Sequence, residues 1–326
     1  MIEAYGLTKQ FAEFTAVKQV DLTVAEGEVL AILGPNGAGK TTTIRMLGAI
    51  LRPTSGSAKI AGFDTVRQAT QVRRIIGLLT EFPGLYTRMK GVEYLHFFGE
   101  LQGLPQAMRQ ERIEKLLKQF QLWEAREKRL GEYSKGMKQK LTLVRAMLHD
   151  PQVLFLDEPT STMDPHSAKL VRDAITSLRA EKRTIIICTH NLAEAELLAD
   201  RIAIISQGQI IAAGSPNALK QQLLGDPVMD VRLARPLNGE LETISGLVEV
   251  VDHGQTWLRY TTAQPQVTNP QLLQLLSDCQ LPVVTLSEVS PSLEDVYLKI
   301  VTDRDTGQPS LNGADYQPQV DHVGRV

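Results

Sequence analysis

The sequence lacks the features of a secreted or membrane-spanning protein. Its 326 residues contain two cysteines, Cys188 and Cys279, too few for a disulfide framework and compatible with a reducing compartment. No apolar run approaches the roughly 18 residues that a membrane span requires. Lys and Arg total 35 against 37 Asp and Glu, so no basic field indicates nucleic acid binding. We therefore expect a cytoplasmic protein that reaches a membrane only through a partner and does not bind nucleic acid.

The length and a change of composition predict two domains and a tail. A hydrophobic content of 43% is enough for a sizeable core. Gly225-Asp226-Pro227 interrupts the chain, so we place a first domain at residues 1–222 and a second at residues 226–302. Residues 303–326 are polar, with little to bury, and are predicted to be disordered.

One stretch of the first domain has the form of a phosphate-binding P-loop, G-x-x-x-x-G-K-[ST]. An apolar run at 29–33 precedes it and a helical pattern at 42–51 follows, as the motif requires, which disfavours a plain Gly-rich turn. Backbone N–H groups of such a loop turn inward around phosphate oxygens. Lys40 would bridge the terminal phosphates, and the Thr41 hydroxyl would bind Mg²⁺. We expect ATP to contact Gly34, Pro35, Asn36, Gly37, Ala38, Gly39, Lys40, Thr41 and Thr42.

Polar groups also follow two apolar runs farther along the chain. Residues 153–156 lead into Asp157 and Glu158, and residues 184–188 lead to His190. Ligands of parallel sheets bind at the carboxyl ends of the strands, where these side chains would lie. Asp157 is therefore expected to hold Mg²⁺, directly or through water, and Glu158 to act as the base or polariser for the attacking water. His190 is expected near the γ-phosphate. A solvated carboxylate pair is the weaker reading beside a P-loop.

The remaining pattern gives the fold class. Alternation of strands and helices around a P-loop predicts a mainly parallel sheet. Residues 90–150 contain helical patterns without a strand, which indicates a helical subdomain at about 82–150. Ser134 is a good N-cap there and marks a second candidate helix start. The second domain reads βαββαβ, a ferredoxin-like order. Further expected elements are strands 2–7 and 17–24, helix 66–73, helix 165–180, helix 238–244, helix 269–278, and a last helix opened by Ser290-Pro291.

Over residues 1 to about 222 the chain resembles the ATP-binding subunit of an ABC transporter. The P-loop and the Asp157-Glu158 pair match the Walker A and Walker B motifs, and residues 133–137, Tyr-Ser-Lys-Gly-Met, resemble the L-S-G-G-Q signature. Asp164 matches the D-loop and His190 the switch histidine. Phe11, which read alone would be a core aromatic, falls where the family has its adenine-stacking aromatic.

The resemblance implies an ATPase that works as a head-to-tail pair. In the family, the signature of one subunit, here Ser134, Lys135 and Gly136 with Asp164, completes the ATP site of the other. The second subunit is another copy of the chain or a paralogue. A membrane permease is expected to dock at residues 81–86, which places the protein at the inner face of the cell membrane. The C-terminal region and its ending at 293–298 resemble accessory domains of ATPases that serve drug, lipid or polysaccharide exporters.

Three positions depart from the family pattern. Glu81 stands where a Gln is usual; its carboxylate can bind Mg²⁺ but cannot also donate to water, so hydrolysis is expected to be slowed or retuned. Lys135 replaces a signature Gly and Met137 a Gln, while Ser134 and Gly136 remain. Other readings are a soluble ABC ATPase that acts on ribosomes or DNA, a P-loop kinase, and a regulatory nucleotide-binding module with weak turnover.

Overall fold

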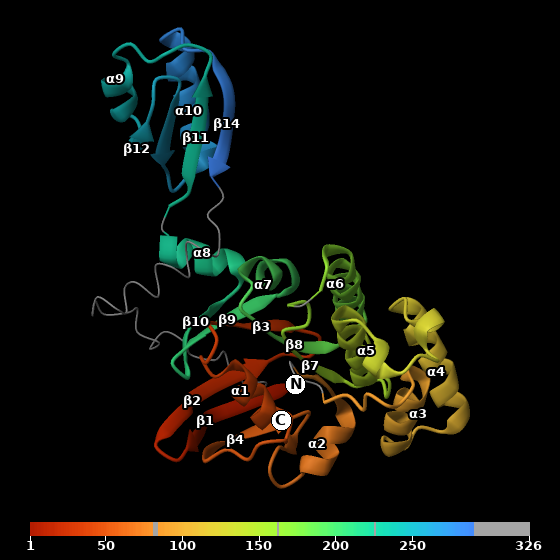
Figure 1. Cartoon of the computed structure of the whole chain (residues 1–326). Helices are drawn as coiled ribbons and strands as arrows, with labels where there is room; N and C mark the ends of the chain where they lie inside the picture. The colour runs from red at the N-terminus through yellow and green to blue at the C-terminus, as the bar shows by residue number, and fades with distance from the viewer. Residues whose placement is uncertain (81–83, 162, 225, 290–326) are drawn as a thin grey trace, which may run out of the picture. The chain divides into compact units, whose positions relative to one another are not determined.

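The computed structural model describes residues 1–80, 84–161, 163–224 and 226–289. The chain separates into two compact units, Met1–Pro216 and a second that begins at Asn217, and each is described by itself (Figure 1). Glu81, which we expected to bind Mg²⁺, lies outside the described residues. So do Phe82 of the expected permease loop, the helix expected from Ser290, and the tail 303–326.

A six-stranded sheet with the order β10-β9-β3-β8-β7-β6 forms the centre of the first unit. Its strands pair in parallel except β10, which is antiparallel to β9. The expectation of a mainly parallel sheet is therefore confirmed. The strands are β3 (Val29–Leu33), β6 (Ile76–Leu79), β7 (Val153–Asp157), β8 (Thr184–Thr189), β9 (Arg201–Ser206) and β10 (Gln209–Gly214).

The second sheet of this unit is antiparallel, with the order β2-β1-β4-β5. Its strands β1 and β2 continue farther than 2–7 and 17–24, down to a pair between Phe11 and Phe14. In this part of the hairpin, exposed residues and register shifts interrupt the alternation of buried and exposed side chains. The hydrophobic pattern of the sequence therefore predicted strands that are too short. The strands are β1 (Ile2–Phe11), β2 (Phe14–Val24), β4 (Ser55–Ile60) and β5 (Phe63–Asp64).

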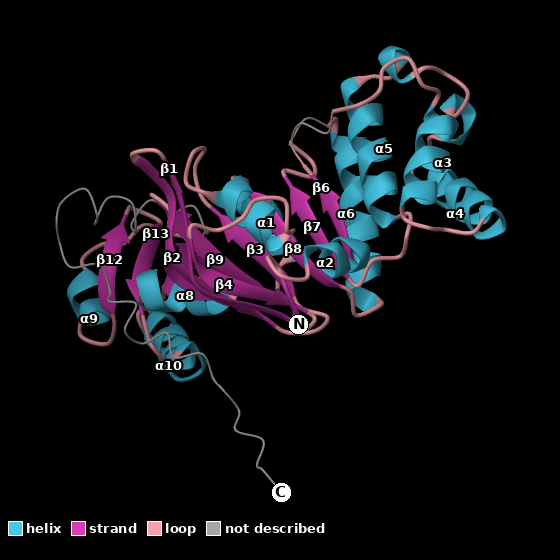
Figure 2. Ribbon diagram, turned by 90° about the horizontal axis from the view of Figure 1, so that it is seen from below, coloured by secondary structure: helices cyan, strands magenta, loops and turns pink. Residues whose placement is uncertain are grey.

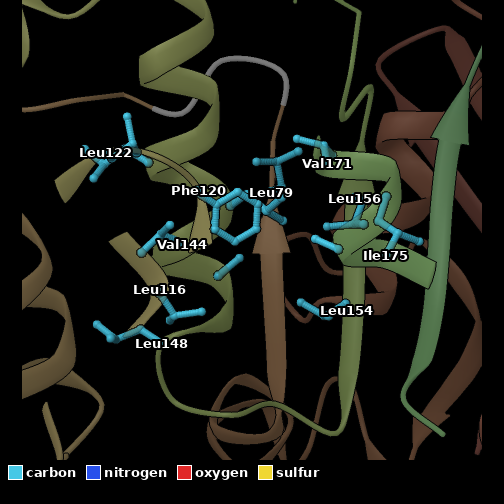
Figure 3. Packing of buried hydrophobic residues seen from close by; sticks show 14 of the residues in the cluster. Leu79, Leu116, Phe120, Leu122, Val144, Leu148, Leu154, Leu156, Val171 and Ile175 are labelled. Carbon is cyan, nitrogen blue, oxygen red and sulfur yellow. The ribbon is translucent and has the colours of Figure 1, made fainter. Parts of the chain in front are cut away.

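Alternate residues of the central strands bury against different neighbours, which explains their continuous apolar sequences. Leu154 and Leu156 belong to one core cluster, Val153 and Phe155 to another. Figure 3 shows Leu154 and Leu156 of β7 facing side chains of α6 on one side of the sheet, with α4 and α5 near β6. On the opposite face, α1 contacts β7 and β8 as well as β2 and β4 of the antiparallel sheet.

The helices of the first unit include the expected helical subdomain. Between β6 and β7 the described residues form helices and no strand, and α3, α4 and α5 group together beside β6 (Figure 2). Helix α2 begins at Ala69 rather than residue 66, because Asp64 first accepts hydrogen bonds from the N–H groups of Val66 and Arg67 in a turn. The helices are α1 (Lys40–Leu47), α2 (Ala69–Ile75), α3 (Gly91–Leu101), α4 (Gln106–Gln119), α5 (Lys135–Met147), α6 (Pro165–Ala180) and α7 (Leu192–Leu198), with short 3₁₀ turns η1 (Trp123–Ala125) and η2 (Leu130–Glu132).

The second unit is an antiparallel sheet, β12-β13-β11-β14, with two helices, in the predicted βαββαβ order. Leu272 and Leu276 of α10 pack against Val231 and Leu258 in its core. Helix α10 begins at Pro265 rather than 269, and Pro270 lies inside it. The elements are β11 (Val228–Leu233), α9 (Leu241–Ser245), β12 (Glu249–His253), β13 (Trp257–Thr261), α10 (Pro265–Asp278) and β14 (Val283–Val289), with α8 (Pro216–Leu224) preceding them.

Helix α9 also begins later than the expected residue 238, because the Glu240 carboxylate accepts hydrogen bonds from Asn238 and Arg235 in the preceding turn. Both cysteines are free, Cys188 buried in β8. Among the described residues, no helix combines the length and apolar character needed to cross a bilayer.

Candidate functional site

The loop between β3 and α1 has the backbone of a phosphate-binding loop. Gly37 and Gly39 adopt φ values of 81° and 107°, which side-chain-bearing residues rarely adopt, and Gly39 caps α1. A Cβ atom at Gly39 would lie 2.6 Å from the carbonyl oxygen of Ala16, so a side chain would push the loop away from β2. The loop thus presents backbone N–H groups and the start of α1 to the space in front of it.

Lys40 is buried at the start of this helix, with an exposed fraction of 6%. Its Nζ atom donates to the carbonyl oxygens of Gly34 and Pro35 at 2.7 and 3.1 Å. The same nitrogen lies 3.9 Å from Oε1 of Glu158. The ammonium group therefore lies between the loop and the end of β7, within reach of both.

A cavity of about 490 Å³ opens over the loop. Phe11 and Phe14, from the two sides of the β1–β2 turn, form one wall, and they are 46% and 64% exposed. Asp157 and Glu158 also line the cavity. The residues that line the cavity are Phe11, Phe14, Ala16, Pro35, Asn36, Gly37, Ala38, Gly39, Lys40, Thr41, Thr42, Asp157 and Glu158.

Glu158 follows the last residue of β7 in a left-handed conformation with φ of 50°. Three contacts hold its backbone there. Its N–H donates to the carbonyl oxygen of Cys188 at 2.8 Å, and its own carbonyl accepts from Nε2 of Gln139 at 3.2 Å and Oγ of Ser161 at 3.3 Å. The backbone of Glu158 is thus fixed by β8, by α5 and by the turn that follows it, although its conformation is an uncommon one.

His190 follows β8 and meets the same carboxylate. Its Nδ1 atom lies 2.8 Å from Oε1 of Glu158. The Glu158 side chain is 9% exposed and that of His190 is 54% exposed, so the imidazole covers the carboxylate from the solvent side. The structure brings together the P-loop residues, Asp157, Glu158 and His190, which the sequence placed in one site.

Two further helix starts carry expected site residues, and neither lines this cavity. Ser134 caps α5, and its Oγ atom accepts from the N–H of Met137 at 3.2 Å. Asp164 caps α6, where hydrogen bonds from the N–H groups of Ser167 and His166 hold the pKa of its carboxyl below its usual range. Ser134, Lys135 and Asp164 are exposed and Gly136 is partly so. A Cβ atom at Gly136 would meet no atom within 4 Å, so other molecules can approach this backbone closely.

Comparison with known proteins identifies the family. The family described as "ABC transporter" matches residues 17–161, and the family "ATP-binding protein DrrA1-3-like, C-terminal domain" matches residues 214–301. The uncharacterized ABC transporter ATP-binding protein YxlF of Bacillus subtilis (strain 168) is 38% identical over 304 residues, which cover 92% of this chain and 99% of that protein. The chain belongs to the ABC transporter ATP-binding proteins.

Another relative in this family is named for drug resistance. The daunorubicin/doxorubicin resistance ATP-binding protein DrrA of Streptomyces peucetius is 37% identical over 95% of this chain and 93% of its own length. A solved ATP-binding subunit of an ABC transporter is 30% identical with a TM-score of 0.64, over 68% of this chain and 92% of that one. A dimeric ATP-binding cassette solved with ADP and Pi shares the fold, with a TM-score of 0.62 at 24% identity, over 66% of this chain and 98% of that one.

As a member of the ABC transporter ATP-binding proteins, the chain is an ATPase subunit. The loop that resembles Walker A joins β3 to α1, and the pair that resembles Walker B consists of the last residue of β7 and the residue after it. His190 follows β8, and the stretch that resembles the signature leads into α5. Three contact residues escaped the sequence analysis. Phe14 lines the cavity with Phe11, and Gln139 donates to the carbonyl oxygen of Glu158. Glu194 accepts from the hydroxyl of Thr160, two residues after Glu158. The aromatic pair three positions apart was visible in the sequence, whereas nothing local distinguished Gln139 or Glu194.

Proposed function

We propose that two copies of this chain, or one copy and a paralogue, close head to tail on ATP and hydrolyse it in sites that both subunits build. The main support is that Ser134, which caps the start of α5, is exposed and does not line the cavity formed by the P-loop. At the start of α5, a Cβ atom on Gly136 would meet no other atom, so a ligand can come close to the backbone there. This supports a role for the start of α5 in contacting a nucleotide bound to another subunit. The dimeric cassette with the same fold supports this arrangement.

Within one site, the phosphates replace contacts that the protein makes with itself. Lys40, now bonded to the carbonyl oxygens of Gly34 and Pro35, would exchange them for phosphate oxygens. The Thr41 hydroxyl and the Asp157 carboxylate line the same cavity, and hard oxygen donors of this kind fit Mg²⁺ bound together with phosphates. Mg²⁺ would neutralise charge on the phosphates; Thr41, Asp157 and Glu81 are the ligands we propose.

Hydrolysis requires a base for water, and Glu158 is the proposed one. Its carboxylate lies at the end of β7 beside the P-loop lysine, at the side of the cavity where the terminal phosphate would lie. His190 orients that carboxylate through the 2.8 Å contact and would reach the γ-phosphate from the exposed side. Phe11 is the proposed adenine-stacking residue, with Phe14 beside it.

The proposed transport partner is a membrane permease, which would hold the protein at the inner face of the cell membrane. Tyr86, Tyr94, Phe97 and Phe98 form a cluster of ring contacts between the loop after β6 and α3, and Tyr86 and Phe97 are exposed. An exposed aromatic group of this kind fits a helix of the permease. The name of one relative, the Nod factor export ATP-binding protein I of Rhizobium sp. (strain N33), favours export as the direction. Residues 1–222 would bind nucleotide and 226–302 would form an accessory domain, a division that the two family matches support.

A mixing experiment tests whether the site is shared. Lys40→Ala removes the P-loop function and Ser134→Arg blocks the signature, so each variant alone should be inactive. Mixed, the pair contains dimers in which an intact P-loop faces an intact signature, and ATPase activity should return. A mixture as inactive as its components would contradict the shared site. The double variant Lys40→Ala/Ser134→Arg mixed with Ser134→Arg is the matched control, because no intact pairing can form in it.

A further inference from the structure

A buried carboxylate outside the described cavity connects the two segments that carry Glu158 and His190. Glu194 lies in α7 and is 4% exposed. Its Oε1 atom accepts from the hydroxyl of Thr160 at 2.6 Å, and its Oε2 atom accepts from the hydroxyl of Thr189 at 3.0 Å. One carboxylate therefore joins the turn after β7 to the end of β8.

The geometry of the two threonines suits an acceptor with two oxygens. The Thr189 oxygen already accepts from the N–H of Asn191 at 3.0 Å, which leaves its proton to donate to Glu194. Asn191 in turn caps α7 by accepting from the N–H of Glu194 at 3.1 Å. The short contact from Thr160 is typical of a hydroxyl that donates to a charged oxygen.

This connection lies at the end of the sheet where the pairing of β7 with β8 stops. Register pairing between β7 and β8 ends at Asp157 and Cys188. Beyond it, Thr160 is two residues after Glu158, and Thr189 is one residue before His190. The carboxylate of Glu194 thus joins Thr160, in the turn after β7, to Thr189, the last residue of β8, which is still paired with Leu33 of β3. These two segments carry Glu158 and His190, whose side chains lie within 2.8 Å of each other.

Burying the carboxylate of Glu194 costs solvation free energy, so packing alone does not explain a glutamate at this buried position. Burial raises the pKa of Glu194; hydrogen bonds from Thr160 and Thr189 oppose that shift, and the charge of Glu158 adds to it. A hydrophobic residue would avoid this cost but would leave two threonine hydroxyls on separate segments without a common partner.

We propose that Glu194 is a positioning residue for ATP hydrolysis, which holds the turn after Glu158 and the end of β8 at the separation where Glu158 and His190 meet. The proposal rests on the functions proposed above for those two residues. Glu194 itself does not contact the nucleotide, and it acts on the water-activating carboxylate through the backbone. Its loss should therefore affect turnover and leave ATP binding at the P-loop intact.

Steady-state hydrolysis by Glu194→Ala provides the test. We expect kcat to fall about tenfold or more, because small displacements of catalytic groups cost this much, while the KM for ATP stays near that of the wild type. Glu194→Gln, which keeps one acceptor and the side-chain length, should retain more activity than Glu194→Ala. Adding Thr160→Val to Glu194→Ala should cause little further loss, because the bridge is already broken. Glu196→Ala, an exposed carboxylate of the same helix, is the matched control and should behave as the wild type.

Two further measurements separate the possible failures. ATP binding stoichiometry and the thermal unfolding midpoint of each variant report whether the chain is folded. A folded Glu194→Ala protein with wild-type kcat, or a loss of kcat that only follows the loss of folded chain, would overturn the positioning role. Glu158→Gln is measured beside it: if that variant hydrolyses ATP normally, the proposed base is wrong, whereas an inactive Glu158→Gln with a fully active Glu194→Ala would refute the positioning role alone.

Discussion

His190 and Glu158 meet through a contact of 2.8 Å between Nδ1 and Oε1, with the carboxylate buried and the imidazole exposed. In the tautomer that carries its proton on Nδ1, His190 donates to the carboxylate and fixes the orientation of its oxygens. His190→Ala should lower kcat by about 100-fold or more, the usual effect of losing such a group. Binding of ATP, measured by equilibrium fluorescence of a labelled nucleotide, should change little. A variant with wild-type turnover would show that the contact has no catalytic function.

Lys40 is expected to matter for binding as well as for turnover. It is buried between the P-loop carbonyl groups and Glu158, so phosphates must meet its ammonium group on entry. Lys40→Ala should weaken ATP affinity by about tenfold or more, the equivalent of one charge-assisted hydrogen bond. Calorimetric titration with ATP and Mg²⁺ measures this effect. Lys138→Ala, on α5 and away from the cavity lining, serves as the control, and unchanged affinity in Lys40→Ala would remove the P-loop assignment.

The two exposed phenylalanines of the cavity wall allow a direct comparison. Phe11 is the residue that the family resemblance assigns to the adenine, and Phe14 is the residue that the structure adds. Stacking of a base on an aromatic ring is worth about 1 to 3 kcal/mol, so Phe11→Ala should weaken ATP binding by about fivefold to a hundredfold. Phe14→Ala should have the smaller effect. If the order of the two variants is reversed, Phe14 and not Phe11 stacks on the base.

In the second unit, Asp230 should contribute to stability in a pH-dependent way. Burial disfavours its charge, but hydrogen bonds from Arg259 and Arg232 outweigh this and hold the pKa of its carboxyl below the usual range. Because the folded-state pKa is lowered, the stabilisation is complete above the unfolded-state pKa of about 3.9 and is lost as the pH falls through the folded value. Asp230→Asn should therefore destabilise this unit by about 1 to 3 kcal/mol at neutral pH.

Urea unfolding of the full chain can report this unit alone. Trp123 and Trp257 are the two tryptophans, and Trp257 lies between Arg232 and Arg259 in the second unit. In a chain that carries Trp123→Phe, Trp257 is the remaining tryptophan, so the fluorescence emission reports the unfolding of the second unit around β13. Glu288→Gln, which removes an exposed charge from β14, is the control. If Asp230→Asn is as stable as the parent at neutral pH, the contacts of Asp230 with the two arginines do not stabilise the unit. The same conclusion follows if the free energy of unfolding of both proteins falls equally as the pH is lowered.

The sequence predicted the parts of this fold that depend on local pattern. Apolar runs of five residues gave β3 with the observed bounds, and the form of the P-loop fixed its position between that strand and α1. Helix α6 was placed at the observed residues 165–180, since Asp164 and Pro165 are strong start signals. Elements that start with a side-chain-stabilised turn, such as α2 and α9, were placed too early, because their hydrophobic pattern does not separate the turn from the helix.

Contacts between distant segments were beyond the reach of the sequence. Gln139 lies 19 positions before the carbonyl group that it contacts, and Glu194 lies 34 positions after Thr160. Only the folded sheet brings α5 and α7 to the end of β7, and a glutamine or glutamate on a helix otherwise indicates a solvent-exposed face. The individual functions of the site residues remain predictions, and the variants above test them one by one.

The central claim is that ATP joins two chains through surfaces that each chain presents separately. Glu158→Gln keeps the size and polarity of the proposed base and removes its ability to accept a proton, so ATP should bind and persist. Light scattering after size exclusion, with ATP and Mg²⁺ in the buffer, measures the mass of this variant directly. We predict twice the chain mass of 36.1 kDa with ATP and a single chain mass with ADP. A monomer that retains bound ATP, both alone and with its permease, would contradict the account.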